Sequence, residues 1–305
     1  MARSDGLVLA IFGPTASGKS AVAEAIAERI PAEIVSADAM QAYRGLPIIT
    51  NQPVGPTRLV GIWPLDHDGS VAEYADLAHT VIDEILTSGR TPIVAGGTGL
   101  YLRAALAELG VPPAPPAGAR ERWEQLYDES GADAAHEALA SADPDAAAAV
   151  HPNDRRRVVR ALELAEAGSS LRPAADRLWT EEMRHPTLVA GLDVPAEEVA
   201  RRIEERARAM VERGAADEAK RALAGPLSTT AGKVIGLEEF GTLPADEAVE
   251  AVVRRTRQYA AYQRKWLRRI PDVVSVRADR PLDAVADEIL EVARARQRLP
   301  ARRAG

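Results

Sequence analysis

Eight consecutive residues near the N-terminus have the types and spacing of a phosphate-binding loop: Gly13, Pro14, Thr15, Ala16, Ser17, Gly18, Lys19 and Ser20. They match the pattern G-x-x-x-x-G-K-S/T, in which glycines let backbone N–H groups converge on phosphate oxygens at the start of a helix. Lys19 would supply a mobile positive charge, and Ser20 a hydroxyl ligand for Mg²⁺. The loop predicts a di- or triphosphate site, and it leaves a kinase, an NTPase and a pyrophosphate-releasing transferase open.

Two further polar segments stand where strands are expected to end. One contains Asp38, and the other contains Thr98 in a glycine-rich run. Because loops at the carboxyl ends of parallel strands share one crevice, both residues are expected to face the phosphate loop. Plainer roles stay open: Asp38 could cap a helix or ligate Mg²⁺, and Thr98 could be a turn residue.

Alternating strand and helix patterns are expected to position these residues. Apolar runs predict buried strands at residues 7–12, 33–36 and 92–95, and four-residue apolar spacing predicts helices at 20–30 and 71–86. This order implies right-handed crossovers and a parallel sheet. The expected fold class is α/β: a P-loop NTPase-like parallel sheet flanked by helices, with a helical insertion domain.

Prolines and glycines at residues 110–118 predict a linker between parts of the chain. We expect residues 1–110 to form the first part of the P-loop core and residues 111–185 to form the helical insertion. Residues 186–297 are expected to return to the core with C-terminal helices, and residues 298–305 to be a disordered tail.

Composition excludes several classes of protein. The 305 residues include no Cys, so disulfides and thiolate metal sites are excluded, and the five His lack metal-ligand spacing. A net charge of −7 argues against an indiscriminate polyanion binder, although a local basic cluster is compatible with it. With no signal peptide and no membrane-length apolar run, we expect a cytoplasmic protein that does not bind membranes.

Two arginine-rich segments could contact nucleic-acid phosphates. The first is a cluster on one or two helical turns, Arg155, Arg156, Arg157 and Arg160. The second is a stripe on a late helix, Arg254, Arg257, Arg264 and Arg268, opposite an apolar side. Pairing with nearby Glu or simple solvation of a helix face is the alternative for both.

Taken in order, these motifs resemble the tRNA dimethylallyltransferases (tRNA isopentenyltransferases), from about Leu7 to Arg268. Later segments at residues 191–193, 234–239 and 256–260 support the resemblance, as does the spacing from Thr98 to Arg120. The family implies transfer of a dimethylallyl group from its diphosphate to N6 of the adenosine immediately 3′ of the tRNA anticodon. Its partners would be dimethylallyl diphosphate and the tRNA anticodon stem-loop, and we expect a monomer.

The resemblance also implies roles for individual residues. Asp38 would be the general base for the adenine amino group. Lys19, Thr98 and Arg120 would serve the reacting centre, residues 13–20 would hold the diphosphate, and Ser20 would ligate Mg²⁺, the expected cofactor. The implied tRNA contacts are Asp38, Ala39, Met40, Gln41, Arg156, Arg157, Val158, Val159 and Arg160.

The chain departs from the family pattern at several positions. Ala39 replaces a Ser, residues 49–53 replace G-T-x-K-P so that Gln52 replaces a Lys, a His-His-Leu segment is missing near residues 57–63, and Leu237-Glu238 replaces Tyr-Lys. These changes put the substrate contacts of residues 47–63 in doubt. Three other functions stay open: prenylation of a free adenine nucleotide, an ATP-using small-molecule kinase, and an inactive RNA-binding relative.

Overall fold

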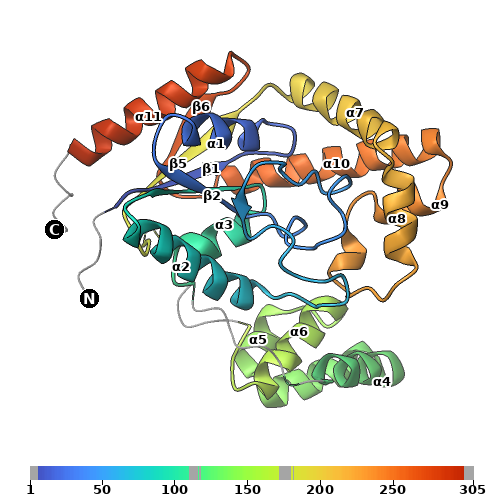
Figure 1. The fold of residues 1–305 in the computed structure, drawn as a ribbon. Coiled ribbons are helices and arrows are strands. Elements are labelled where there is room, and N and C mark those ends of the chain that lie inside the picture. The colour runs from blue at the N-terminus through green and yellow to red at the C-terminus, as the bar shows by residue number, and fades with distance from the viewer. Residues whose placement is uncertain (1–5, 110–115, 117, 172–179, 181, 299–305) are drawn as a thin grey trace. The chain divides into compact units, whose positions relative to one another are not determined.

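The computed structural model describes residues 6–109, 116, 118–171, 180 and 182–298 (Figure 1). The chain divides into two compact units: Met1–Glu108 with Glu181–Gly305, and Leu109–Thr180. Most of the proline-rich linker and residues 299–305 of the expected tail lie outside the described residues.

A six-stranded sheet forms the centre of the first unit, and every neighbouring pair in it is parallel. The strand order is β3-β2-β4-β1-β5-β6. The bounds are β1 Val8–Phe12, β2 Ala32–Ser36, β3 Thr57–Arg58, β4 Thr91–Gly96, β5 Thr187–Asp193 and β6 Val273–Arg277. All five residues of β1 are buried, as expected for a central strand with both faces covered. The α/β fold class expected from the sequence is confirmed, whereas the short edge strands β3 and β6 were not anticipated.

Helices cover both faces of this sheet (Figure 1). The connection through α1 (Lys19–Ala27) runs from β1 toward the edge at β3, and that through α2 (Val71–Thr87) runs back from β3 to β4. Right-handed crossovers in opposite directions place the two helices on opposite faces. Helix α11 (Leu282–Arg298) packs beside α1, and α3 (Gly99–Leu106) packs beside α2.

A group of helices between β5 and β6 completes the first unit. It consists of α7 Ala196–Glu212, α8 Ala215–Leu223, the 3₁₀ turn η2 Ala231–Lys233, α9 Leu237–Thr242 and α10 Ala245–Leu267. Helix α10 contacts α7, α9 and α3, so one long helix adjoins both the sheet layer and this group. Its buried side includes Val252, Thr256, Ala260 and Gln263.

The second unit is helical. It contains α4 (Ala119–Ala142), α5 (Pro144–Ala149) and α6 (Arg155–Glu166), and Gly131 interrupts α4 with a φ of 87°. Its own apolar core includes Leu139, Val158 and Leu162. In neither unit does a helix within the described residues have the length and apolarity needed to cross a membrane.

Candidate active site

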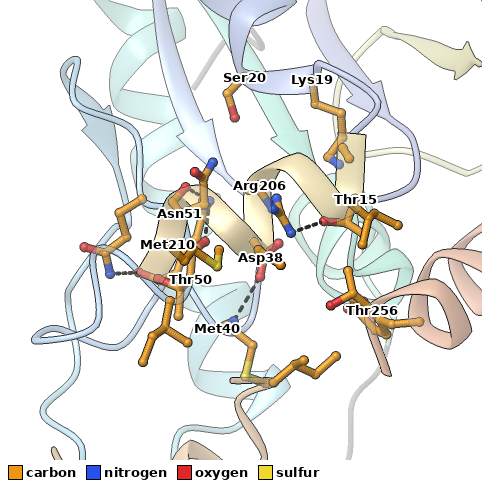
Figure 2. A pocket seen from close by; sticks show the side chains of 18 of the residues that line it. Thr15, Lys19, Ser20, Asp38, Met40, Thr50, Asn51, Arg206, Met210 and Thr256 are labelled. Carbon is orange, nitrogen blue, oxygen red and sulfur yellow. Dashed lines mark hydrogen bonds between the residues drawn. The ribbon is translucent and has the colours of Figure 1, made fainter. Parts of the chain in front are cut away.

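A cavity of about 920 Å³ opens in the first unit at the carboxyl ends of the central strands. The phosphate loop, the loop after β2, helix α7 and helix α10 all line it. Figure 2 shows Arg206 reaching from α7 to Thr15, next to Asp38. The cavity therefore joins segments that are far apart in the sequence.

The phosphate loop connects β1 to α1. Gly18 stands just before α1 with a φ of 93°, a left-handed conformation that favours glycine over every residue with a Cβ. Lys19 and Ser20 follow it and line the cavity, and Lys19 Nζ donates a hydrogen bond of 2.9 Å to the carbonyl oxygen of Pro14. The N-terminus of α1 thus faces the cavity with its free N–H groups, as an anion site requires.

A second cation, Arg206 of α7, stands at this end of the cavity. Its Nη2 donates a 2.7 Å hydrogen bond to Thr15 Oγ1. Burial lowers the pKa of Lys19 to about 8, an effect that Asp38 opposes and Arg206 reinforces. Burial also lowers the pKa of Arg206, again opposed by Asp38. Lys19 and Arg206 are thus two desolvated cations near the carboxylate of Asp38. A bound polyanion would supply negative charge in place of the water they have lost, so this end of the cavity favours an anionic ligand.

Asp38 and Thr98 meet at this edge of the sheet. Asp38 Oδ1 accepts a 3.0 Å hydrogen bond from the Met40 N–H, which directs the loop after β2. Thr98 Oγ1 accepts a 3.4 Å bond from the Ala39 N–H and lies 3.2 Å from the Tyr259 hydroxyl. The loops can approach because a Cβ on Gly96 would lie only 2.1 Å from the Ala37 carbonyl oxygen.

Gln263 of α10 connects the phosphate loop to the loop after β4. Its Oε1 accepts a 2.7 Å hydrogen bond from the Thr15 N–H, and its Nε2 donates a 2.9 Å bond to the Gly97 carbonyl oxygen. The residue is 2% exposed, and a Cβ on Gly97 would lie 2.3 Å from its Nε2. One buried carboxamide therefore fixes the separation of two loops at the cavity.

Tyr259 lines the cavity one turn before Gln263. Burial, reinforced by the Asp38 charge, raises the pKa of its hydroxyl to about 12. The group therefore keeps its proton at neutral pH and can donate to Thr98.

The loop at residues 46–53 holds its shape without the Lys of the family pattern. Gln52 Nε2 donates to the carbonyl oxygens of Gln41 and Tyr43, at 3.2 and 2.7 Å. Gln41 in turn donates to the Asn51 carbonyl oxygen at 3.0 Å. Ala39 is buried, so the family's Ser at this position would not face the cavity. Gln52 thus provides the donor that this loop needs, although it carries no charge.

Part of the cavity lining is apolar. Helix α7 contributes Ile203, Ala207 and Met210 to it, and Ile49 and Val252 lie on other segments of its lining. Figure 2 shows Met40 on the side of Asp38 away from Ser20, and Met210 beside Asp38. The cavity therefore combines cations, one carboxylate next to them and apolar side chains that suit a short hydrocarbon chain.

The other residues to which the family resemblance assigns a role lie in the second unit. Arg120 lies 3.3 Å from Glu124 and 4.0 Å from the nearly buried Glu163, which also pairs with Arg160 at 3.0 Å. Arg156 and Arg157 are exposed and make no ion pair with the described residues. Val158 and Val159 are 0% and 2% exposed, so their side chains pack in the interior and are not presented to a ligand.

The oxygen donors of the cavity suit a hard cation that is shared with a ligand. Among the described residues, no three His, Cys, Asp or Glu side chains are grouped as in a metal cage made by protein alone. Ser20 and Asp38 both line the cavity, and Mg²⁺ commonly takes one or two protein oxygens and completes its octahedron with phosphate and water. The residues present therefore fit Mg²⁺ held mainly by a bound diphosphate.

Sequence reasoning assigned no site role to three residues that the structure brings to the cavity. Arg206 belongs to a segment, Arg202-Ile203 with Arg206, that supports the family resemblance, and it interrupts the apolar inward face of its helix. The spacing of Tyr259 puts it on the apolar side of its helix, which suggests packing only, and no local pattern distinguishes Gln263. Arg264, expected to be exposed, instead donates to the Val194 carbonyl oxygen at 2.8 Å.

Fold and site together define the class of α/β proteins with a P-loop, here with a cavity that combines cations, a carboxylate and apolar side chains. Comparison with known proteins is consistent with this class. Residues 41–270 match the family model described as IPP transferase, and residues 6–57 match the model described as Isopentenyl transferase. The chain belongs to the IPP transferase family, which confirms the resemblance drawn from its motifs.

Individual relatives agree with the family model over most of the chain. The tRNA dimethylallyltransferase of Corynebacterium jeikeium is 38% identical over 90% of this chain and 92% of its own, and that of Streptomyces coelicolor is 39% identical over 87% and 88%. The crystal structure of a tRNA isopentenylpyrophosphate transferase from Bacillus halodurans superposes with a TM-score of 0.67 at 32% identity, covering 96% of each chain. A eukaryotic dimethylallyltransferase, captured acting on tRNA, gives 0.79 at 25% identity over 98% of this chain and 81% of its own.

Proposed function

We propose that this protein transfers a dimethylallyl group from dimethylallyl diphosphate to N6 of the adenosine immediately 3′ of a tRNA anticodon, releasing pyrophosphate. One observation carries the proposal: a single cavity is lined by the cation Lys19, by apolar side chains such as Met210, and by the carboxylate of Asp38. The cations suit the diphosphate of the donor and the apolar side chains suit its hydrocarbon part. The relatives, named as transferases acting on tRNA, support the choice of acceptor.

The cations of the cavity act on the leaving group. As the bond between C1 of the dimethylallyl group and the diphosphate oxygen breaks, both electrons of that bond pass to the diphosphate. Lys19, the N–H groups at the start of α1 and Arg206, held on Thr15, stabilise the charge that develops there. Binding of the diphosphate is expected to raise the lowered pKa of Lys19 again, because negative phosphate oxygens favour the protonated amine.

Asp38 acts on the acceptor. The adenine amino group is a weak nucleophile, because its lone pair is delocalised into the ring. When N6 attacks C1, one N6 proton passes to the Asp38 carboxylate, whose position is set by the Met40 N–H. Such general-base assistance contributes about 10²–10⁴-fold. Thr98, held by Tyr259, keeps the neighbouring Ala39 peptide in place.

Ser20 would hold Mg²⁺ against the diphosphate oxygens. The ion would neutralise charge on the departing diphosphate.

The second unit is proposed to contact tRNA. Arg156 and Arg157 are exposed and make no ion pair with the described residues, so their guanidinium groups are available to RNA phosphates. Arg120 is proposed to serve the reacting centre, as the resemblance implies, although its contacts are to Glu124 and Glu163. A monomer acting in the cytoplasm is part of the same proposal.

One experiment tests the proposal against its alternatives. Purified enzyme with Mg²⁺ and labelled dimethylallyl diphosphate is offered an anticodon stem-loop, AMP or no acceptor. We expect label on the stem-loop, and loss of that label in Asp38→Ala. Label on AMP alone would favour a free-nucleotide prenyltransferase, and no label together with ATP turnover on a small molecule would favour a kinase; either result refutes the proposal.

A further inference from the structure

Residues 46–51 form a hydrogen-bonded turn, in which the Thr50 N–H donates to the Leu46 carbonyl oxygen at 3.1 Å. The Thr50 hydroxyl donates to the same oxygen at 2.7 Å. Three residues of this turn line the cavity: Ile49, Thr50 and Asn51. The position of the turn therefore sets part of the cavity wall.

The start of this turn has no capping side chain of its own. N–H groups at the start of a helical turn lack partners within the turn and need an acceptor from a side chain or water. Gly45, just before the turn, has no side chain, and Pro47 has no N–H. The next two N–H groups, those of Ile48 and Ile49, therefore need acceptors from another part of the chain.

Glu218 of α8 supplies these acceptors from about 170 positions further along the chain. Its Oε1 accepts from the Ile49 N–H at 2.8 Å and from the Ile48 N–H at 3.0 Å, and its Oε2 accepts from the Ile48 N–H at 3.0 Å. The residue is 2% exposed and forms no ion pair with the residues that the structure describes. Because a buried carboxylate is costly unless hydrogen bonds satisfy it, Glu218 and the turn depend on each other.

Helix α8 is directly continuous with a second wall of the cavity. It follows α7 after Arg213 and Gly214, and Gly214 turns the chain with a φ of 92°. Helix α7 contributes Ala207 and Met210 to the cavity lining, whereas Glu218 is not among the described residues that line it. Glu218 thus joins two walls of one cavity without facing its interior.

The side chain of Ile49 is also held. Ile49 is 5% exposed, and a Cβ on Gly236 would lie 3.1 Å from its Cγ2, so the two segments are closely packed. Ile49 stands where the family pattern has a Gly, so this chain adds an apolar side chain to the cavity wall at that position. Its N–H is fixed by Glu218 and its side chain by packing beside Gly236.

We propose that Glu218 is a positioning residue for donor binding, because it fixes the turn of residues 46–51 relative to α7 and so preforms the cavity around dimethylallyl diphosphate. This inference rests on the proposed function and deepens it, since it assigns donor affinity in part to a residue that does not touch the donor. Without the carboxylate, the turn leaves its place for part of the time. The donor then binds only the fraction of molecules in which the cavity is complete, and the apparent affinity falls by that fraction.

Calorimetric binding of dimethylallyl diphosphate with Mg²⁺ tests the proposal. Glu218→Ala removes both acceptors and is expected to weaken binding about 10- to 150-fold, the equivalent of one hydrogen bond to a charged group. Glu218→Gln keeps an Oε1 that can accept from both N–H groups, so its affinity is expected to stay within about fivefold of the wild type. In steady-state prenyl transfer, Glu218→Ala is expected to raise the KM for the donor more than it lowers kcat.

Val285→Ala is the control for a general loss of stability. Val285 lies in α11, is 1% exposed and is not among the described residues that line the cavity. Urea unfolding is expected to show that both Val285→Ala and Glu218→Ala are less stable than the wild type. The donor affinity of Val285→Ala is nevertheless expected to equal that of the wild type.

Amide hydrogen exchange without any ligand tests the contact itself. Peptides that cover residues 46–53 are expected to exchange faster in Glu218→Ala than in the wild type, and at the wild-type rate in Glu218→Gln and Val285→Ala. Unchanged exchange in Glu218→Ala would show that the carboxylate does not hold the turn.

The inference is overturned if Glu218→Ala binds the donor like the wild type, or if Val285→Ala weakens binding equally. It is also overturned if Glu218→Gln binds as poorly as Glu218→Ala, because the acceptor oxygen would then not be what matters. A wild type that binds no dimethylallyl diphosphate would refute the proposed function, and the exchange data would still decide whether Glu218 holds the turn. Normal donor binding by Glu218→Ala refutes this inference and leaves the proposed function intact.

Discussion

Gln263 offers a sharp test of how the two loops at the cavity are held. Gln263→Met keeps the volume of the side chain and removes both of its hydrogen bonds. The Thr15 N–H and the Gly97 carbonyl oxygen then lose their partner beside a residue that is only 2% exposed. The Gly97 carbonyl oxygen is buried, and leaving it without a partner costs about 1–3 kcal/mol of folding free energy, whereas the Thr15 N–H lies at the cavity and can bind water.

Gln263→Glu separates positioning from stability. The carboxylate can still accept from the Thr15 N–H, but it faces the Gly97 carbonyl oxygen and adds negative charge beside the proposed diphosphate site. We expect it to raise the KM for dimethylallyl diphosphate more than Gln263→Met does, although both variants lower the stability. The assays are urea unfolding and steady-state prenyl transfer, with the exposed Gln125→Met as a matched control.

The reasoning about Gln263 is refuted by a specific result. If Gln263→Met unfolds within about 0.5 kcal/mol of the wild type and its KM for the donor is unchanged, the carboxamide does not hold the loops.

Three further predictions concern the cavity itself. Because the pKa of Lys19 is about 8 and a diphosphate binds its protonated form, donor affinity measured by calorimetry should fall above pH 8 by up to about tenfold per unit, and Lys19→Met should remove this dependence. Asp38→Asn should lower kcat by about 10²–10⁴-fold with donor binding retained; unchanged kcat would exclude a general base there. Ala207→Leu, which fills apolar space in the cavity, should raise the KM for the donor and leave inhibition by pyrophosphate unaltered; equal effects on both would contradict the assignment of the apolar side chains to the hydrocarbon part of the donor.

The sequence alone determined the parts of this protein that depend on local order. A glycine loop between an apolar strand and an amphipathic helix predicts a phosphate site directly, because these signals lie within about twenty residues of one another. Alternation of strands and helices then restricts the sheet to parallel pairing, and the carboxyl ends of β2 and β4 bring Asp38 and Thr98 to one edge. The sheet, the phosphate loop and the family were all accessible in this way.

Only the tertiary structure decided which side chains complete the site. Arg206 reaches Thr15 across 191 positions of the chain, and Gln263 reaches it across 248. Such pairs leave no periodic pattern, since a polar residue on the buried side of a helix looks the same whether it joins two loops or only packs. Periodicity likewise assigned Arg264 to the exposed stripe. In the structure Arg264 donates to the carbonyl oxygen of Val194, just after β5, and is half-buried, whereas Lys265 is exposed. The physical reason is that hydrogen-bond partners distant in sequence are chosen by packing, which a one-dimensional pattern does not contain.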